Sequence, residues 1–283
     1  MGRPLTWLDV FTSVPLAGNG LCVVHDADDL DEATMLAIAR ETRLSETTFV
    51  QTATESGADY RNRIFTLHGE LPFAGHPSLG TAVAVARARG QAQASYVQQT
   101  HAGLQPVDVT LDGVDARASM LQNPAVFGAE LDPARVLAAV GLGLAEANAA
   151  WPPQLVSTGV PHVVTPVRDV AALARARADE TLLPALLDEL GAICVYVAAV
   201  DSQDGAGRAR SFFMGDAGAL EDPATGSAVG PLLAYVAERA GVQELTVGQG
   251  AEIGRPSTLH AAVEGDRVRV TGDVVVVAEG TSL

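Results

Sequence analysis

The sequence predicts an α+β fold of two similar halves, each built from a curved sheet of short strands around one central helix. Three observations carry this prediction: an internal repeat, many short segments rich in β-branched residues, and two helical segments with few charged side chains. A helix that is apolar on nearly all sides is buried on nearly all sides, so we expect the sheet of each half to enclose its helix.

The repeat relates segments of the chain that lie 146 residues apart. His76–Val83 matches Asp222–Val229 with proline, glycine, alanine and valine at the same places, and the same offset pairs Thr12–Pro15 with Thr158–Pro161. A third match, Arg63–Phe65 with Arg210–Phe212, lies one residue out of step. Matches in one order at one offset indicate two halves related by a pseudo-twofold axis.

The expected halves are residues 1–123, joined by a C-terminal strand at 273–283, and residues 124–272. Halves of this kind usually leave a cleft between them, and such clefts bind small ligands.

Alternating or β-branched patterns predict the strands, and glycines mark the helix ends. The strands expected in the first half are Thr6–Val10, Thr47–Val50, Arg63–Thr66, Val107–Leu111 and Ala116–Leu121. Those expected in the second half are Leu155–Ser157, His162–Val164, Ile193–Ala199, Ala209–Phe213, Ala261–Val263, Arg267–Val270 and Val274–Val277. The two central helices are expected at Ser78–Arg89 and Thr225–Arg239, with further helical stretches at Asp31–Thr42 and Pro133–Val140.

Composition narrows the classes of function. The chain of 283 residues is 48% hydrophobic and 18% charged, with a net charge of −16, so nucleic acid and anionic membrane surfaces are disfavoured as partners. Because no apolar run reaches the ~20 residues of a membrane span and the N-terminus does not resemble a signal peptide, we expect a cytoplasmic protein. Cys22 and Cys194 lie in apolar segments and are expected to be buried, small hydrophobic residues.

Each of the two repeated segments places an ionisable side chain at the start of a predicted helix. Free N–H groups at a helix N-terminus bind anions, so two such helices facing one cleft would hold a carboxylate without lysine or arginine. His76 and Asp222 are then expected at equivalent points. A histidine can donate or accept a proton near neutral pH, whereas an aspartate near a helix N-terminus should stay ionised.

Glu46 is the third candidate. It follows a helical stretch and directly precedes an apolar strand. The residue 146 positions later is Ala192, so the second half has no acid at the equivalent position. Partial burial of a glutamate raises its pKa toward the range useful for proton transfer. A structural cap or an ion pair with Arg43 is the alternative interpretation.

These blocks together resemble the PhzF family, the phenazine-biosynthesis-type isomerases. The resemblance runs from end to end of the chain. It is carried by Leu8–Thr12, Gly18–Asn19, Leu44–Val50, Arg63–Thr66, Glu70–Ala82, Glu221–Ala228 and Gln249–Ser257.

The resemblance implies the diaminopimelate-epimerase-like fold, in which each half is a barrel-like, mostly antiparallel sheet around a central helix. It implies that Glu46 is the general acid/base, with His76 and Asp222 as further catalytic groups that orient the substrate. The resemblance and the two helix starts together imply the residues that bind the substrate. These are Gly18, Asn19, Gly75, Ser78, Gly226 and Ser227. A homodimer acting on a small carboxylate-bearing molecule, without a metal or an organic cofactor, is the expected enzyme.

Two alternatives remain open at this point. A racemase or epimerase would need acid/base groups on both faces of the substrate, and a non-catalytic protein that binds small acids would use the same cleft. Related racemases carry two cysteines at the helix starts, where this chain has His76 and Asp222, so a two-thiol mechanism is disfavoured. The resemblance does not identify the substrate, and phenazine synthesis itself does not follow from it.

Overall fold

The computed structural model describes residues 2–215 and 218–282, so the outer ends of the expected halves, residues 1 and 283, lie outside it. The chain forms two compact units. The N-terminal unit consists of Met1–Leu121 and Thr271–Leu283, and the C-terminal unit consists of Gln122–Val270.

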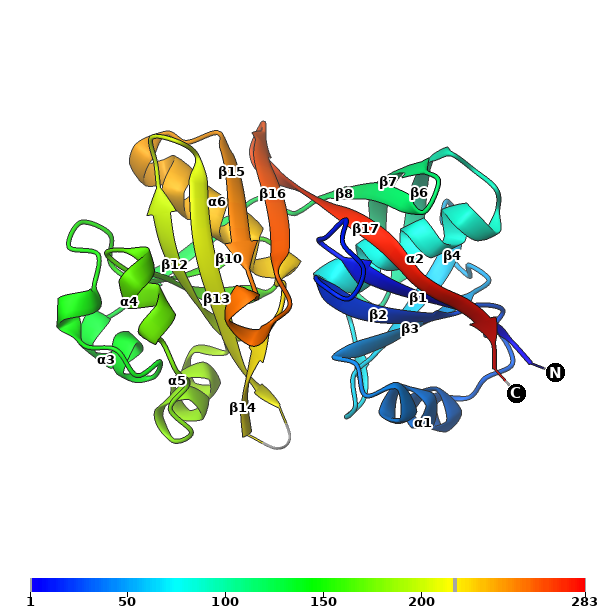
Figure 1. Cartoon of the computed structure of the whole chain (residues 1–283), viewed down its shortest axis with the longest axis horizontal. Coiled ribbons are helices and arrows are strands. Elements are labelled where there is room, and N and C mark those ends of the chain that lie inside the picture. Colours follow the sequence, from blue (N-terminus) through cyan, green and yellow to red (C-terminus); the bar gives the residue numbers. More distant parts are fainter. Residues whose placement is uncertain (1, 216–217, 283) are drawn as a thin grey trace. The chain divides into compact units, whose positions relative to one another are not determined.

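Eight strands of the N-terminal unit close into a barrel (Figure 1). In order of pairing they are β1 (Pro4–Val10), β2 (Asn19–Val24), β3 (Glu46–Gln51), β4 (Tyr60–Phe65), β6 (Gln93–Thr100), β7 (Gly103–Asp112), β8 (Asp115–Leu121) and β17 (Arg267–Thr281), which pairs again with β1. The pairs β2–β3 and β4–β6 are parallel, and the hairpins are antiparallel. The short strand β5 (Glu70–Leu71) pairs antiparallel with the end of β4.

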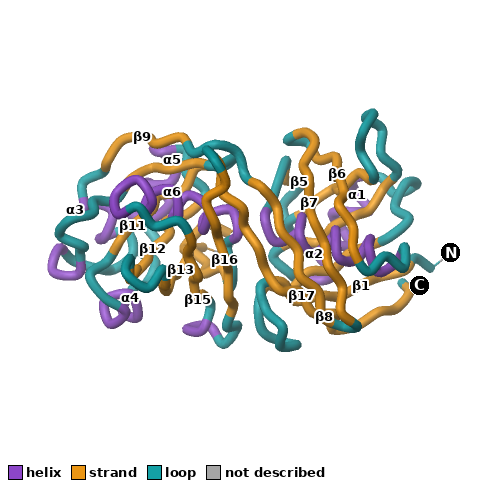
Figure 2. The backbone as a smooth tube through the Cα atoms, turned by 90° about the horizontal axis from the view of Figure 1, so that it is seen from above, coloured by secondary structure: helices purple, strands orange, loops and turns teal. Residues whose placement is uncertain are grey.

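Helix α2 (Gly75–Ala88) fills this barrel, and Figure 2 shows it among the strands. Every residue from Gly75 to Ala86 is buried, which confirms the prediction of an enclosed helix. Close packing explains its small residues: a Cβ at Gly80 would lie 2.5 Å from Leu21 Cδ2. A second helix, α1 (Glu32–Thr42), packs on β3 and β4, and the Asp31 carboxylate caps its N-terminus.

The C-terminal unit repeats this plan around helix α6 (Gly226–Ala240). Its strands pair in the order β9 (Val126–Glu130), β10 (Gln154–Ser157), β11 (Pro161–Pro166), β12 (Cys194–Asp201), β13 (Ala206–Gly215), β15 (Glu244–Gln249) and β16 (Ser257–Glu264). Strand β14 (Gly218–Asp222) pairs antiparallel with the end of β13. The remaining elements are α3 (Pro133–Ala138), α4 (Val170–Arg175), α5 (Leu182–Leu190) and the turns η1 (Leu144–Glu146) and η2 (Ala251–Ile253). Apolar side chains of α3, α4 and α5 form a second core with those of β11, β12 and β13.

One buried ion pair recurs in both units and defines the repeat. Arg63 on β4 pairs with Glu70 on β5, and Arg210 on β13 pairs with Glu221 on β14, each with two hydrogen bonds. Each guanidinium also lies over the ring of the phenylalanine two residues further on. The sequence match of Arg63–Phe65 with Arg210–Phe212 therefore corresponds to the same arrangement of side chains in both units.

The expected equivalence of His76 and Asp222 is wrong. Five positions separate the phenylalanine from the glutamate in the first unit and nine in the second, because the β13–β14 hairpin is longer than the β4–β5 hairpin. The offset consequently grows before the central helices begin. His76, the second residue of α2, corresponds to Ser227, the second residue of α6, and Asp222 corresponds to Leu71.

The predicted strands and helices are present, with shifted ends. The central helices begin at Gly75 and Gly226 instead of Ser78 and Thr225, and the strands expected at Arg267–Val270 and Val274–Val277 form one long strand, β17. Elements that were not predicted are β2, β5, β6, β9, β14, β15, α4 and α5. Among the helices in the described part of the chain, none has the length and apolar character needed to cross a bilayer.

Candidate active site

Glu46 and His76 meet in the N-terminal unit. Glu46 is the first residue of β3, and His76 lies in the first turn of α2, the helix that the barrel encloses. Glu46 Oε2 lies 3.3 Å from His76 Nε2, and only 16% and 6% of the two side chains are exposed. Two sequence-predicted site residues thus form a buried acid–imidazole pair.

The His76 ring is neutral. Burial lowers its pKa from 6.5 to about 3, so the imidazole carries no charge at neutral pH. The Asn19 side-chain amide nitrogen lies 3.3 Å from His76 Nδ1, and the Ser45 hydroxyl donates to Asn19 Oδ1 at 3.3 Å. Because the amide nitrogen can only donate, Nδ1 accepts, and the ring proton resides on Nε2, the atom that faces Glu46.

Through these two hydrogen bonds Asn19 orients the His76 ring, and the turn at Gly18 holds Asn19 in place. Gly18 has a φ of +66°, and a Cβ there would lie 2.4 Å from the side chain of Thr12, so the turn that delivers Asn19 into β2 requires glycine. Gly75 is the first residue of α2. Ser78 is fully buried and its hydroxyl donates to the Ala74 carbonyl at 2.8 Å, within the helix.

In the C-terminal unit, Asp222 ends β14 and belongs to a hydrogen-bonded turn that leads into α6. The Thr225 hydroxyl donates to Asp222 Oδ2 at 2.5 Å. The Gln249 amide group donates to the Asp222 carbonyl at 2.8 Å and accepts from the Thr225 N–H and the Tyr196 hydroxyl at 3.2 and 3.0 Å. Because Gln249 is 1% exposed, this side chain fixes the turn from inside the unit.

The turn is completed by one close approach of the backbone, at Gly250, and one side-chain hydrogen bond, to Gly226. Gly250, with a φ of +77°, leaves no room for a side chain, since a Cβ would lie 2.5 Å from the Pro223 carbonyl oxygen. Gly226 then begins α6, and its carbonyl accepts from the Gln122 side chain at 2.9 Å. Ser227 is half-buried, and among the hydrogen bonds of the described residues none involves its hydroxyl. The first turn of α6 therefore offers N–H groups and a hydroxyl to an anion.

Both cysteines are inert in this fold, as the sequence predicts. Cys22 and Cys194 are 2% and 1% exposed, and burial raises their pKa values to about 11 and about 12. A thiol with so high a pKa is not the ionised form that transfers protons or binds metals. Within residues 2–215 and 218–282, no group of three or more His, Cys, Asp or Glu side chains could hold a metal ion.

Sequence reasoning assigned no role to Ser45, Gln249 or Tyr196. The sequence does contain a signal for two of them: Ser45 is next to Glu46, and Gln249 begins a motif of the family resemblance. Their roles depend on hydrogen bonds across 24 to 53 positions of sequence, which no local pattern encodes.

A search against family models matches residues 8–280 to the phenazine biosynthesis-like protein family, PhzC–PhzF. The chain belongs to the PhzF family. It is 38% identical to the trans-2,3-dihydro-3-hydroxyanthranilate isomerase of Pseudomonas aeruginosa, over 96% of each chain. The predicted family and the predicted isomerase class are thereby confirmed.

Solved structures support the PhzF fold. A predicted epimerase of Pseudomonas aeruginosa matches with a TM-score of 0.86 and 37% identity over 99% of both chains. A PhzF-family phenazine biosynthesis protein of Bacillus anthracis matches with a TM-score of 0.85 and 28% identity, covering 100% of this chain and 99% of that one. A hydroxyproline epimerase of Agrobacterium vitis shares the fold at 15% identity and a TM-score of 0.64, covering 99% and 92% of the chains.

Proposed function

We propose that this chain isomerises a small carboxylate-bearing, unsaturated substrate by moving one proton between two carbon atoms, with Glu46 as the only acid/base. The observation that carries the proposal is the 3.3 Å approach of Glu46 Oε2 to a neutral His76 whose Nε2 bears the proton. A carboxylate can remove a proton from a carbon atom next to an activating group and return the proton to a different carbon atom.

His76 would assist without taking part in the proton transfer. When Glu46 removes the proton, negative charge develops on the substrate, and the Nε2–H group can donate a hydrogen bond to that charge. Because its pKa is about 3, His76 is not a competent base or cationic acid at neutral pH. The arrangement supports a proton shift on one face of the substrate over a racemase, which needs a second acid/base on the opposite face.

Binding groups for the substrate carboxylate are available at the helix starts. The N–H groups at Gly75 and Gly226, and the Ser227 hydroxyl, are suited to bind anionic oxygen, and Asp222 is suited to accept a hydrogen bond from a substrate hydroxyl or amine. We propose that each of these groups binds substrate, in a homodimeric enzyme that requires no cofactor.

The identity to a named isomerase provides the first substrate to test. Trans-2,3-dihydro-3-hydroxyanthranilate, followed by NMR, should be converted by the wild-type chain. Glu46→Gln keeps the size of the side chain and removes the base, so conversion should fall by at least about 10³-fold while the fold and substrate affinity persist. Glu41→Gln, the same substitution at an exposed position of α1, is the matched control.

If this compound is not a substrate, a thermal-shift screen of small unsaturated acids provides the next candidates. Chiral analysis of the product distinguishes the mechanisms, since inversion at a single carbon would contradict a same-face shift. Conversion by Glu46→Gln at the wild-type rate would remove Glu46 from its proposed role.

A further inference from the structure

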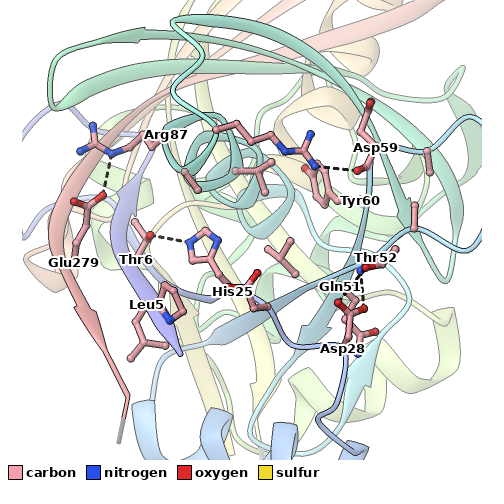
Figure 3. A pocket seen from close by; sticks show the side chains of 18 of the residues that line it. Leu5, Thr6, His25, Asp28, Gln51, Thr52, Asp59, Tyr60, Arg87 and Glu279 are labelled. Carbon is pink, nitrogen blue, oxygen red and sulfur yellow. Dashed lines mark hydrogen bonds and ion pairs between the residues drawn. The ribbon is translucent and has the colours of Figure 1, made fainter. Parts of the chain in front are cut away.

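A cavity of about 920 Å³ lies beside the last turns of α2 in the N-terminal unit, and several charged side chains of its wall are paired (Figure 3). Arg87 Nε lies 3.2 Å from Glu279 Oε1. The N–H group and the hydroxyl of Thr52 donate to the Asp28 carboxylate at 2.8 and 3.0 Å. These pairs stabilise the wall and do not indicate a ligand.

The turn before α6, in the C-terminal unit, contains a closed hydrogen-bond network around Asp222. The Gln249 Nε2 group donates to the Asp222 carbonyl at 2.8 Å and to the Thr225 hydroxyl oxygen at 3.0 Å. Its Oε1 atom accepts from the Thr225 N–H group at 3.2 Å and from the Tyr196 hydroxyl at 3.0 Å. Because a backbone carbonyl can only accept and a backbone N–H group can only donate, the orientation of this amide is fixed.

Gln249 in turn decides the direction of the Thr225 hydroxyl. This hydroxyl has a single hydrogen, and the Gln249 Nε2 group already donates to its oxygen. The hydrogen is therefore directed to Asp222 Oδ2, which lies 2.5 Å from the hydroxyl oxygen. Hydrogen bonds to an ionised carboxylate are stronger than those between neutral groups, so Gln249 orients the Asp222 carboxylate through Thr225.

The N-terminal unit makes the corresponding turn without this network. The strand registers, aligned on Arg63 and Arg210, give every residue of the network an equivalent. The equivalents of Asp222, Thr225, Gln249 and Tyr196 are Leu71, Ala74, Thr100 and Thr48, in that order. Leu71 and Ala74 have apolar side chains, and the Thr100 hydroxyl donates to the Gly103 carbonyl at 3.2 Å. A turn of this kind therefore forms without a buried amide behind it.

Burial gives the network a cost that the turn alone does not explain. Gln249 is 1% exposed and Tyr196 is 0% exposed. Polar groups are costly to bury, even when hydrogen bonds offset most of the cost. A buried glutamine that the other unit does without indicates a role beyond folding.

We propose that Gln249 is a positioning residue of the active site, which orients the Asp222 carboxylate through Thr225 and is itself held by Tyr196. The inference rests on the proposed role of Asp222 in accepting a hydrogen bond from the substrate. A carboxylate that is already oriented loses less conformational freedom when the substrate binds. The network should consequently affect substrate affinity and not the proton transfer at Glu46.

Affinity measured in the Glu46→Gln chain tests the proposal without turnover. The probe is trans-2,3-dihydro-3-hydroxyanthranilate, titrated by calorimetry. Adding Thr225→Val removes the hydroxyl at nearly constant shape and should weaken binding about 3- to 10-fold, the worth of one hydrogen bond. Thr225→Ser keeps the hydroxyl and should bind within about 2-fold of the parent chain. Thr258→Val, the same change at an exposed position of β16, is the matched control.

Gln249→Glu tests the direction of the hydroxyl. A carboxylate at position 249 can accept but not donate, so the Thr225 hydroxyl can turn toward it and away from Asp222. The variant should weaken binding at least about 10-fold, since a hydrogen bond to a charged group is lost.

A double-mutant cycle separates positioning from a general structural role. Asp222→Ala should itself weaken binding at least about 10-fold. Adding Thr225→Val to Asp222→Ala should change the affinity by less than about 2-fold, because the hydroxyl then has no carboxylate to orient. Additive losses, or full affinity in both Thr225→Val and Gln249→Glu, would overturn the positioning role and leave the proposed function intact. Full affinity in Asp222→Ala would instead remove Asp222 from the proposed function, and the positioning role with it.

A crystal structure of the Thr225→Val variant tests the orientation without any probe. The Asp222 carboxylate should leave its wild-type rotamer or occupy two conformers, while the backbone of the turn is unchanged. An Asp222 carboxylate in the wild-type position in this variant would overturn the proposal.

Discussion

Stability should fall between pH 7.5 and 5.5 because burial holds His76 and His162 neutral, and the lowered pKa of His25 contributes in the same direction. His76 and His162 are 5% and 0% exposed, and burial lowers the pKa of each from 6.5 to about 3. Contact with the backbone of Ser227 opposes part of this shift at His162. Below pH 6.5 the unfolded chain binds protons at these rings and the folded chain does not, so stability is present above that pH and is lost as the pH falls toward 3.

The magnitude follows from the two pKa values. At pH 5.5 an unfolded histidine with a pKa of 6.5 is about ten times more protonated than unprotonated, whereas the buried ring is still neutral. Each histidine therefore removes about 1.4 kcal/mol of stability over this interval, and the two remove about 2.7 kcal/mol.

Urea unfolding at the two pH values measures this loss. His162→Gln lowers the absolute stability as well, because His162 Nδ1 lies 3.1 Å from Cys194 Sγ, so the informative quantity is the difference between the two pH values. That difference should shrink by about 1.4 kcal/mol relative to wild type. His68→Gln, at an exposed bend, should leave it unchanged. An unchanged difference in His162→Gln would refute the reasoning that burial keeps this ring neutral.

Three further substitutions test the geometry of the site and of the repeat. Asn19→Ala removes the donor that fixes the His76 tautomer, so kcat should fall about 10- to 100-fold in a steady-state assay while KM changes little. Gly250→Ala should destabilise the C-terminal unit by more than about 1 kcal/mol in urea unfolding, because φ is +77° and a Cβ would lie 2.3 Å from a backbone oxygen. Arg210→Met leaves the 10%-exposed Glu221 carboxylate without its cation, and should cost about 3–5 kcal/mol by the same measurement.

Much of the fold could be predicted because its determinants are local. The apolar helices, their glycine ends and the β-branched strands follow from residues that are near one another in sequence. Strands β2 and β6 were missed for the same reason: β2 begins with Asn19-Gly20, a turn-like pair, and β6 contains three glutamines, at positions 93, 98 and 99. Pairing with distant strands on both sides overrides these weak local preferences.

The residues of the site could be predicted from the sequence, but which residues are equivalent in the two units could not. Glu46 and His76 were found, one as an acid without a twin and the other from a repeated motif, and the structure brings them together. The equivalence of His76 with Asp222 failed because a longer hairpin shifts the offset, and only the two arginine–glutamate pairs reveal the shift. The neutral state of His76 depends on burial inside a barrel, which a linear pattern does not contain.

The central claim is that Glu46 carries the proton, and deuterium exchange tests it most directly. Substrate incubated with wild type or Glu41→Gln in heavy water should acquire deuterium at the carbon atoms between which the proton moves, whereas Glu46→Gln, still folded and still binding, should incorporate none. Incorporation by Glu46→Gln at the wild-type rate would show that another group moves the proton and would contradict the mechanism.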